Sequence, residues 1–172
     1  MPTSLPTAPP AETLDDERRS QWAHRIFVAA LGLFVVLGAV GFFGVRSAET
    51  STSAEGYRLT VTYAKVTRGG LATPWSVEVR KEGGFDGPVV LAVTSSYLEM
   101  FDENGLDPDP AAATSDDEFT IWEFDPPSGD TLSVSLDARI EPAVQSGRGG
   151  VLQVRDGDRV VAAVSFSTRV MP

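Results

Sequence analysis

The residues of this chain whose types and spacing best suit ion binding lie in FDENGLDPDP, residues 101–110. Counted from the first aspartate, side-chain oxygens fall at relative positions 1, 3, 6 and 8, which are Asp102, Asn104, Asp107 and Asp109. Calcium takes about six to eight oxygen ligands, so these residues, helped by Asp116 or Asp117, form a candidate calcium site. The EF-hand pattern does not fit, because the glycine falls at position 4 and position 12 is Ala113.

The same stretch also has a purely structural interpretation. Ser96 and Glu99 have the spacing of a capping box, and Asn104-Gly105 is typical of the end of a short helix. The two Asp-Pro pairs that follow favour an extended exit, because the residue before proline avoids the helical region. We favour this interpretation, in which the acids are solvated turn residues, over a bound cation.

Few residues are suited to catalysis. The chain has no cysteine and one histidine, His24, which precedes a long apolar run. Nucleophile pairs and metal sites that need histidine or cysteine are therefore excluded from everything after that run. Two carboxylates can act as acid and base in a glycosidase, but acids are too plentiful here to single out a pair. We expect no enzyme activity, with a carboxylate-based hydrolase as the alternative.

The charge distribution bears on the choice of partner. The formal net charge is −10, and the segment between Lys81 and Arg139 contains fourteen acidic residues and no basic one. Affinity for nucleic acid needs clustered lysine and arginine, so nucleic acid is excluded as a partner. The acidic segment predicts a negative flank that either keeps the domain soluble or attracts a cation or a basic surface.

The strongest signal is IFVAALGLFVVLGAVGFFGV, residues 26–45, which has no charged or strongly polar side chain. A helix of about 20 residues crosses a hydrocarbon core of roughly 30 Å, so we predict one transmembrane span. Arg18, Arg19 and Arg25 precede it and outnumber the basic residues just after it, which favours a cytoplasmic N-terminus. We predict a single-pass protein of the bacterial plasma membrane with an extracytoplasmic C-terminal domain. A cleaved secretory signal is the alternative, although its apolar core would be shorter.

Glycine recurs at intervals of three within the predicted span, at Gly38, Gly41 and Gly44. Small residues let a second helix approach closely, so these glycines are candidate partner-binding positions in the bilayer. The alternative is that glycine is simply common in membrane helices.

Composition and periodicity divide the chain further. Residues 1–12 are rich in proline and small residues and are predicted to be a disordered cytoplasmic tail. A helix over residues 13–45 includes the span. Residues 46–56, RSAETSTSAEG, lack periodicity and are predicted to be a flexible tether. Residues 57–172 form the extracytoplasmic domain, in which apolar and polar residues alternate.

This alternation predicts seven strands. They cover residues 57–63, 75–79, 89–95, 119–124, 132–140, 151–155 and 159–170. Short strands separated by GG, GP, DPP and DG predict a mainly β domain, an antiparallel β-sandwich. Trp75 alternates with valines and is predicted to lie in its core. Trp122 lies in a strand that is apolar on both faces, so it is either core or a partner-binding residue.

The passage around the fourth and fifth strands is similar to a pattern in bacterial Ig-like surface modules. Cell-adhesion-related (CARDB) repeats have a "W…PG(D/E)T…V.V" passage before a long strand, where this chain has Trp122, Pro126, Pro127, Gly129, Asp130 and Thr131. Over about residues 57–170 the chain resembles these modules, which implies a seven-stranded Ig-like β-sandwich. The layout of the whole chain is also similar to that of single-pass membrane proteins of GC-rich bacteria. Neither resemblance implies a chemistry.

We therefore expect a membrane-anchored module that recognises or supports a partner without catalysis. The expected partners are the lipid bilayer and another membrane or cell-envelope protein. The alternative is a calcium-dependent ligand-binding or adhesion domain that uses the acidic loop 102–118. The last strand, near Val170, is either paired or open to another chain.

Overall fold

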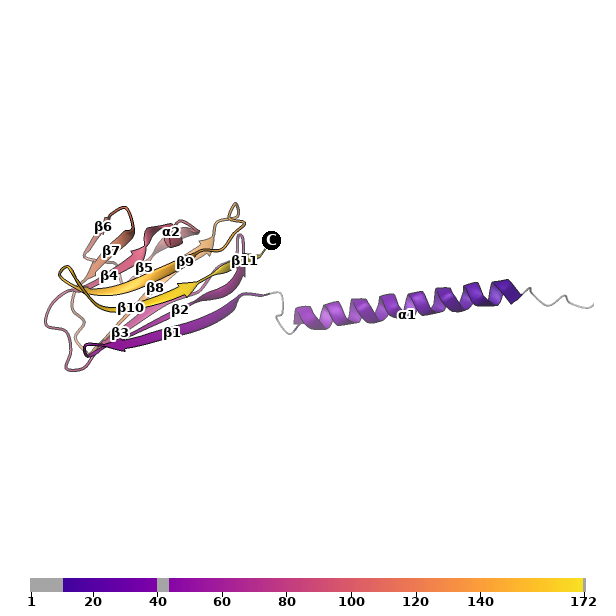
Figure 1. Ribbon diagram of the computed structural model, residues 1–172, viewed down its shortest axis with the longest axis horizontal. Helices are drawn as coiled ribbons and strands as arrows, with labels where there is room; N and C mark the ends of the chain where they lie inside the picture. The colour runs from indigo at the N-terminus through magenta and orange to yellow at the C-terminus, as the bar shows by residue number, and fades with distance from the viewer. Residues whose placement is uncertain (1–10, 40–43, 172) are drawn as a thin grey trace, which may run out of the picture. The chain divides into compact units, whose positions relative to one another are not determined.

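The computed structural model describes residues 11–39 and 44–171 of the chain. Two compact units follow one another, with the boundary between Gly44 and Val45. The first contains the long helix α1, and the second contains every described strand (Figure 1).

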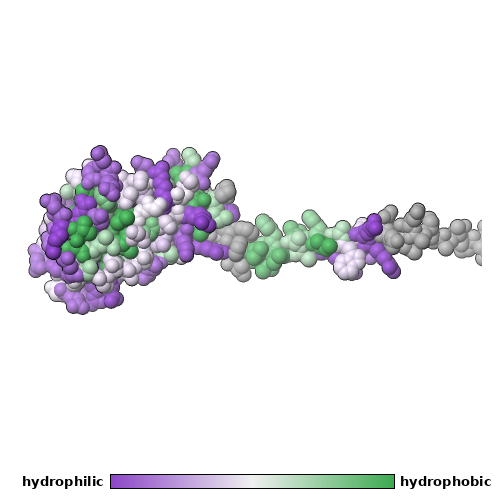
Figure 2. Space-filling model, in the orientation of Figure 1, coloured by the Kyte–Doolittle hydropathy of each residue, from purple (hydrophilic) through white to green (hydrophobic). Residues whose placement is uncertain are grey.

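Helix α1 (Ala11–Ala39) covers most of the segment predicted to be helical and membrane-spanning. Its segment Arg18–Ala39 is 22 residues long, and its apolar window has no buried residue. Figure 2 shows hydrophobic residues along the surface of this helix, and side chains such as Phe27 and Leu33 are more than half exposed. The helix is therefore long and apolar enough to span a bilayer. The predicted span continues to residue 45, and its residues 40–43 lie outside the described part.

The second unit is a sandwich of two β-sheets. Sheet A has the order β1 (Arg46–Ala54), β2 (Tyr57–Arg68), β3 (Trp75–Lys81), β8 (Thr131–Ile140) and β5 (Phe101–Asp107), and β11 (Arg169–Met171) also pairs with β2. Sheet B has the order β10 (Arg159–Ser167), β9 (Gly149–Asp156), β4 (Val89–Thr94), β7 (Phe119–Phe124) and β6 (Ala112–Ser115). All these pairings are antiparallel except that of β11 with β2. The predicted mainly β class is confirmed, but the described residues form eleven strands instead of seven.

The core lies between the two sheets and contains the alternating apolar residues of both. Trp75 of sheet A and Trp122 of sheet B meet edge to face, with ring centroids 6.0 Å apart and an interplanar angle of 78°. Their exposed fractions are 2% and 4%. The prediction that Trp75 is core is confirmed, whereas Trp122 as a partner-binding residue is wrong. Alternation along β7 turns Trp122 and Phe124 inward, opposite buried residues of β4.

The predicted flexible tether at residues 46–56 is wrong, because residues 46–54 form strand β1. The strand pairs with β2 along its length, and the turn between them, Glu55-Gly56, has φ values of 50° and 80°. Two residues with positive φ join antiparallel strands directly. From Ser47 to Ala54 the side chains are serine, threonine, alanine and one glutamate, so no apolar period marks this strand in the sequence. Only its pairing with β2 defines it.

The predicted short helix that ends at Asn104-Gly105 is also wrong in extent. Helix α2 (Ser95–Leu98) is four residues long and has no side-chain cap hydrogen bond, so the predicted capping box is not formed. Residues 101–107 instead form β5, in which Phe101 lies opposite Ile140 and Leu106 opposite Leu136. Burial of these two side chains against the core outweighs the turn preference of Asn-Gly. The ladder accommodates Gly105 at a register shift.

Tyr97 of α2 connects this helix to the C-terminal strands. Its ring is fully buried and contacts the rings of Phe166 and Phe101 at centroid distances of 4.8 and 5.3 Å. Its hydroxyl lies 2.8 Å from the hydroxyl of Thr168. Burial raises the pKa of Tyr97 to about 12, because the phenolate would lose its hydration, and this effect exceeds the opposing one of the Thr168 hydrogen bond.

We expect the stability of the sandwich to fall between about pH 10 and pH 12 because of Tyr97. Below the unfolded pKa of about 10, both states keep the proton and the contribution of Tyr97 is fully present. As the pH rises towards the folded pKa of about 12, Tyr97 ionises first in the unfolded state. The free energy of unfolding therefore falls by about 2–3 kcal/mol. Urea unfolding of the full chain in detergent micelles from pH 8 to 12 measures this loss. Tyr97→Phe should give a flatter profile over that range, and an unchanged slope would contradict the assignment.

Candidate functional site

The structure places the predicted calcium ligands on β5 and in the loop after it. Asp102 lies opposite Arg139 of β8, and Asp107 lies opposite Ser135. Because Arg139 and Ser135 are four residues apart on one strand, Asp102 and Asp107 are separated by roughly 13 Å. Ligands of a single calcium ion lie within about 5 Å of one another. These two aspartates are therefore not brought together around one ion.

The other acids of this region serve the fold or lie in solvent. Asp102 Oδ2 accepts hydrogen bonds from Arg139 Nε and Nη2 at 3.1 and 2.7 Å. Asp116 Oδ1 accepts the backbone N–H groups of Phe119 and Glu118 at 2.6 and 2.8 Å, which lowers the pKa of Asp116 and forms the turn before β7. Asp109 is exposed, and the side chain of Asn104 lies outside the described part. No three histidine, aspartate or glutamate side chains among the described residues gather into a metal site.

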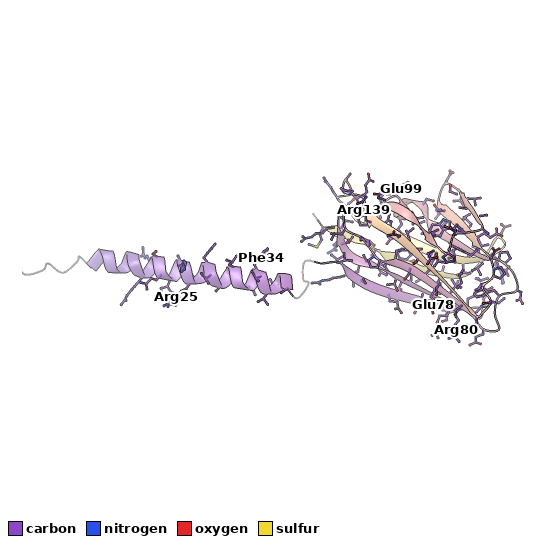
Figure 3. The ribbon with its side chains drawn as sticks, turned by 180° about the vertical axis from the view of Figure 1, so that it is seen from behind. Arg25, Phe34, Glu78, Arg80, Glu99 and Arg139 are labelled. Carbon is purple, nitrogen blue, oxygen red and sulfur yellow. The ribbon has the colours of Figure 1, made fainter. Side chains whose placement is uncertain are left out.

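Four residues of the acidic segment pair with basic residues. The pairs are Arg80–Asp130, Lys81–Asp86, Arg139–Asp102 and Arg148–Glu99, with N–O distances of 3.0, 2.8, 2.7 and 2.5 Å. Figure 3 shows Arg80 towards one end of the sandwich, and Arg139 and Glu99 towards the other. Exposed pairs of this kind contribute little to stability, but they offset charge locally. The predicted negative flank is therefore partly neutralised.

The glycines of the predicted span are described only in part. Gly38 lies in the last turn of α1, and a side chain at this position would meet open space. Gly44 lies just before the sandwich, and Gly41 is outside the described residues. Contact of another helix with these glycines stays a prediction.

A cleft of about 390 Å³ opens at the end of the sandwich opposite the start of β1. Its walls include Tyr57 at the start of β2, Phe85 in the loop before β4, and Asp156 at the end of β9. The rings of Tyr57 and Phe85 are 6.4 Å apart, and Glu123 and Arg155 supply opposite charges nearby. The volume lies within the range of small-ligand sites, about 300–1,000 Å³. The sequence signal for this cleft is GGFDGP, residues 83–88, where an aromatic residue stands in a turn.

The charged pair in this cleft is suited to binding and not to nucleophilic chemistry. Lys81 Nζ lies 2.8 Å from Asp86 Oδ2 and 5.6 Å from the centroid of the Tyr57 ring. Their hydrogen bond raises the pKa of Lys81 and lowers the pKa of Asp86. Lys81 therefore keeps its proton at neutral pH, whereas a nucleophilic lysine needs a depressed pKa.

The outer face of sheet B carries apolar side chains among polar ones. Cross-strand pairing places Val90, Ile121, Val151 and Ala163 on the side of the sheet that faces away from the core. The same registers place Gln153, Arg155 and Glu123 between or beside them, and Ala92 on this face is fully buried. The outer face of sheet A instead carries hydroxyl and charged side chains such as Thr60, Glu78 and Ser133. Solvated faces of antiparallel sheets are normally polar, so the outer face of sheet B is the candidate protein-contact surface.

Comparison with known proteins gives no family for this chain. No protein-family model matches it, and no curated protein matches it.

Proposed function

We propose that this chain is a single-pass membrane protein whose extracytoplasmic β-sandwich is a non-catalytic interaction or accessory module for a membrane or cell-envelope partner. The observation that carries the proposal is the apolar helix Arg18–Ala39, whose apolar window is not buried against any described residue. Apolar surface in water costs roughly 25 cal/mol per Å², so a lipid bilayer is the environment that suits this helix. The arginines at its start favour a cytoplasmic N-terminus, and this supports an extracytoplasmic sandwich.

Seven strands of the sandwich support an Ig-like core. In sheet A, β2, β3, β8 and β5 follow the order of strands A, B, E and D of a constant-type Ig domain. In sheet B, β4, β9 and β10 take the places of strands C, F and G. Strand β1, the β6–β7 hairpin and β11 are then additions to this core. Sandwiches of this architecture are common among cell-surface domains, although the fold alone names no partner.

The outer face of sheet B is where we place the partner contact. Its partly exposed Val90, Ile121 and Val151 lie beside Gln153, Arg155 and Glu123, and such a mixture of apolar and polar groups suits a protein–protein contact. The cleft beside Tyr57 and Phe85 offers rings and charges for a smaller group of the same partner, such as a peptide side chain or a sugar.

Two experiments test the topology and the contact. Before treatment, the chain on intact cells should have its full length. Protease added to these cells should then remove a C-terminal epitope and leave an N-terminal one. A protected C-terminal epitope, or a trimmed soluble product in the medium, would show that the anchor or its orientation is wrong. Ala163→Arg on sheet B should reduce co-purification of the partner from detergent extracts, whereas Ser133→Arg on the outer face of sheet A should not.

A further inference from the structure

The backbone groups along one side of β1 have no partner within the described residues. The Glu55-Gly56 turn sets Ala54 opposite Tyr57, so Ala54 and every second residue before it hydrogen-bond to β2. The residues between them direct their N–H and C=O groups away from the sheet, and they are Ser47, Glu49, Ser51 and Ser53. No described residue hydrogen-bonds to these outward groups. Figure 1 shows β1 at the border of the sandwich with no strand beyond it.

The other sheet edges carry features that block strand addition. Strand β5 has a register shift between Glu103 and Gly105, and prolines follow it closely. Strand β6 has four residues, and β10 has a register shift between Val160 and Ala162. Between Ser47 and Ala54, β1 has neither a shift nor a proline nor a lysine. Proteins normally block exposed edges of this kind, so an open one indicates a surface that is used.

We propose that β1 pairs with β1 of a second copy of this chain, antiparallel, so that the two sheets A become one continuous sheet. The short side chains of β1 leave its backbone accessible, and Glu49 is its only charged residue between Ser47 and Ala54. The strand is self-complementary when Thr50 lies on the two-fold axis. Glu49 then faces Ser51 of the second copy, and Ser47 faces Ser53 of the second copy. In this register every outward backbone group of the four residues finds a partner.

The neighbouring registers are less favourable. A shift by two residues in one direction sets Glu49 opposite Glu49, and like charges directly opposite each other destabilise a strand pair. A shift in the other direction sets Ser47 opposite Glu55, which belongs to the turn and whose carboxylate binds Arg159 at 3.0 Å. The two-fold axis is perpendicular to the sheet, and two copies anchored in one bilayer can share such an axis. The charge pattern therefore selects one register and the same chain as its occupant.

Lysine substitutions test this register in the full chain purified in detergent micelles. Ser51→Lys places a lysine opposite Glu49 of the second copy and should keep or strengthen the dimer. Adding Glu49→Lys sets lysine opposite lysine and should weaken association by about tenfold or more. Light scattering gives the protein mass in the micelle. A parent chain that is monomeric, or two variants that associate equally well, would overturn the proposal.

Proline substitutions separate association from folding. Ser51→Pro removes an N–H that points away from β2, so the sandwich should keep its circular dichroism spectrum and lose the dimer. Thr50→Pro removes an N–H that bonds to β2 and should destabilise the sandwich itself. A folded Ser51→Pro variant that still dimerises would mean that the copies do not pair through β1.

Single cysteines report the same pairing in native membranes, because the chain has no cysteine of its own. In Ser51→Cys the two thiols are diagonal neighbours within roughly 8 Å, so a short bismaleimide should link two copies. Thr114→Cys on β6, at an edge of sheet B, should not be linked. Linkage of Ser51→Cys to a different protein would assign the edge to that protein and overturn the two-copy proposal. The protease experiment reads the topology separately, so failure of the pairing leaves the proposed function standing.

Discussion

Replacing Trp122 with alanine is expected to lower the free energy of unfolding by about 3–5 kcal/mol. The indole is 4% exposed, and it packs edge to face against Trp75 across the two sheets. Alanine removes this contact and leaves a cavity that the surrounding strands fill only in part. Urea unfolding of the full chain in detergent micelles, followed by far-ultraviolet circular dichroism, measures the change.

Ile121→Ala is the matched control, because Ile121 is the adjacent residue on the opposite side of the same strand. It is half-buried, so its loss should be clearly smaller than that of Trp122→Ala. If the two variants lose equal free energies of unfolding, or if Trp122→Ala is as stable as the parent chain, Trp122 is not a core residue and is again a candidate for partner binding.

Gly147→Ala is expected to destabilise the sandwich by about 3 kcal/mol or more. A Cβ atom at Gly147 would overlap with the backbone oxygen of Thr168 and would lie 2.7 Å from Cα of Arg169. These are backbone atoms at the junction of β10 and β11, where the N–H of Thr168 donates to the carbonyl of Arg148 at 3.0 Å. Relief of the overlap would therefore pull β11 away from β2.

Gly149→Ala is a control from the start of the following strand. Its added Cβ would meet the backbone oxygen of Phe166 at 3.7 Å, an ordinary contact, so the substitution should cost about 1 kcal/mol or less. The two unfolding midpoints, measured side by side, give the difference. If Gly147→Ala is as stable as Gly149→Ala, the close approach of residues 147 and 168 does not exist in solution.

The mainly β class and the apolar helix could be predicted because burial imposes a period on the side chains. In β8, Leu132, Val134 and Leu136 are buried and alternate with exposed residues, so the strand is visible in the sequence. In α1 the apolar residues run without interruption from Ile26 to Ala39, which matches a lipid environment around this part of the helix. In both cases the pattern lies within one segment of the sequence.

Strands β1 and β5 could not be predicted, because the residues that hold them in strand conformation lie elsewhere in the chain. The serine and threonine side chains of β1 carry no apolar period, and its strand conformation comes from the ladder with β2. In β5 the Asn-Gly pair indicates a turn, but burial of Phe101 and Leu106 against β8 overrides it. The positions of the acids in the candidate calcium site also depend on distant residues, since Asp102 pairs with an arginine 37 residues away.

By itself the sequence determined that an apolar helix precedes a β domain in whose strands apolar and polar residues alternate. It also determined that residues 46–172 contain no histidine or cysteine. Only the tertiary structure decided that Trp122 is core, that Asp102 and Asp107 stand apart, and that β1 presents an open edge. The physical reason is that hydrogen-bond ladders, ion pairs and core contacts join residues distant in sequence. Their energies depend on neighbours that no local stretch contains.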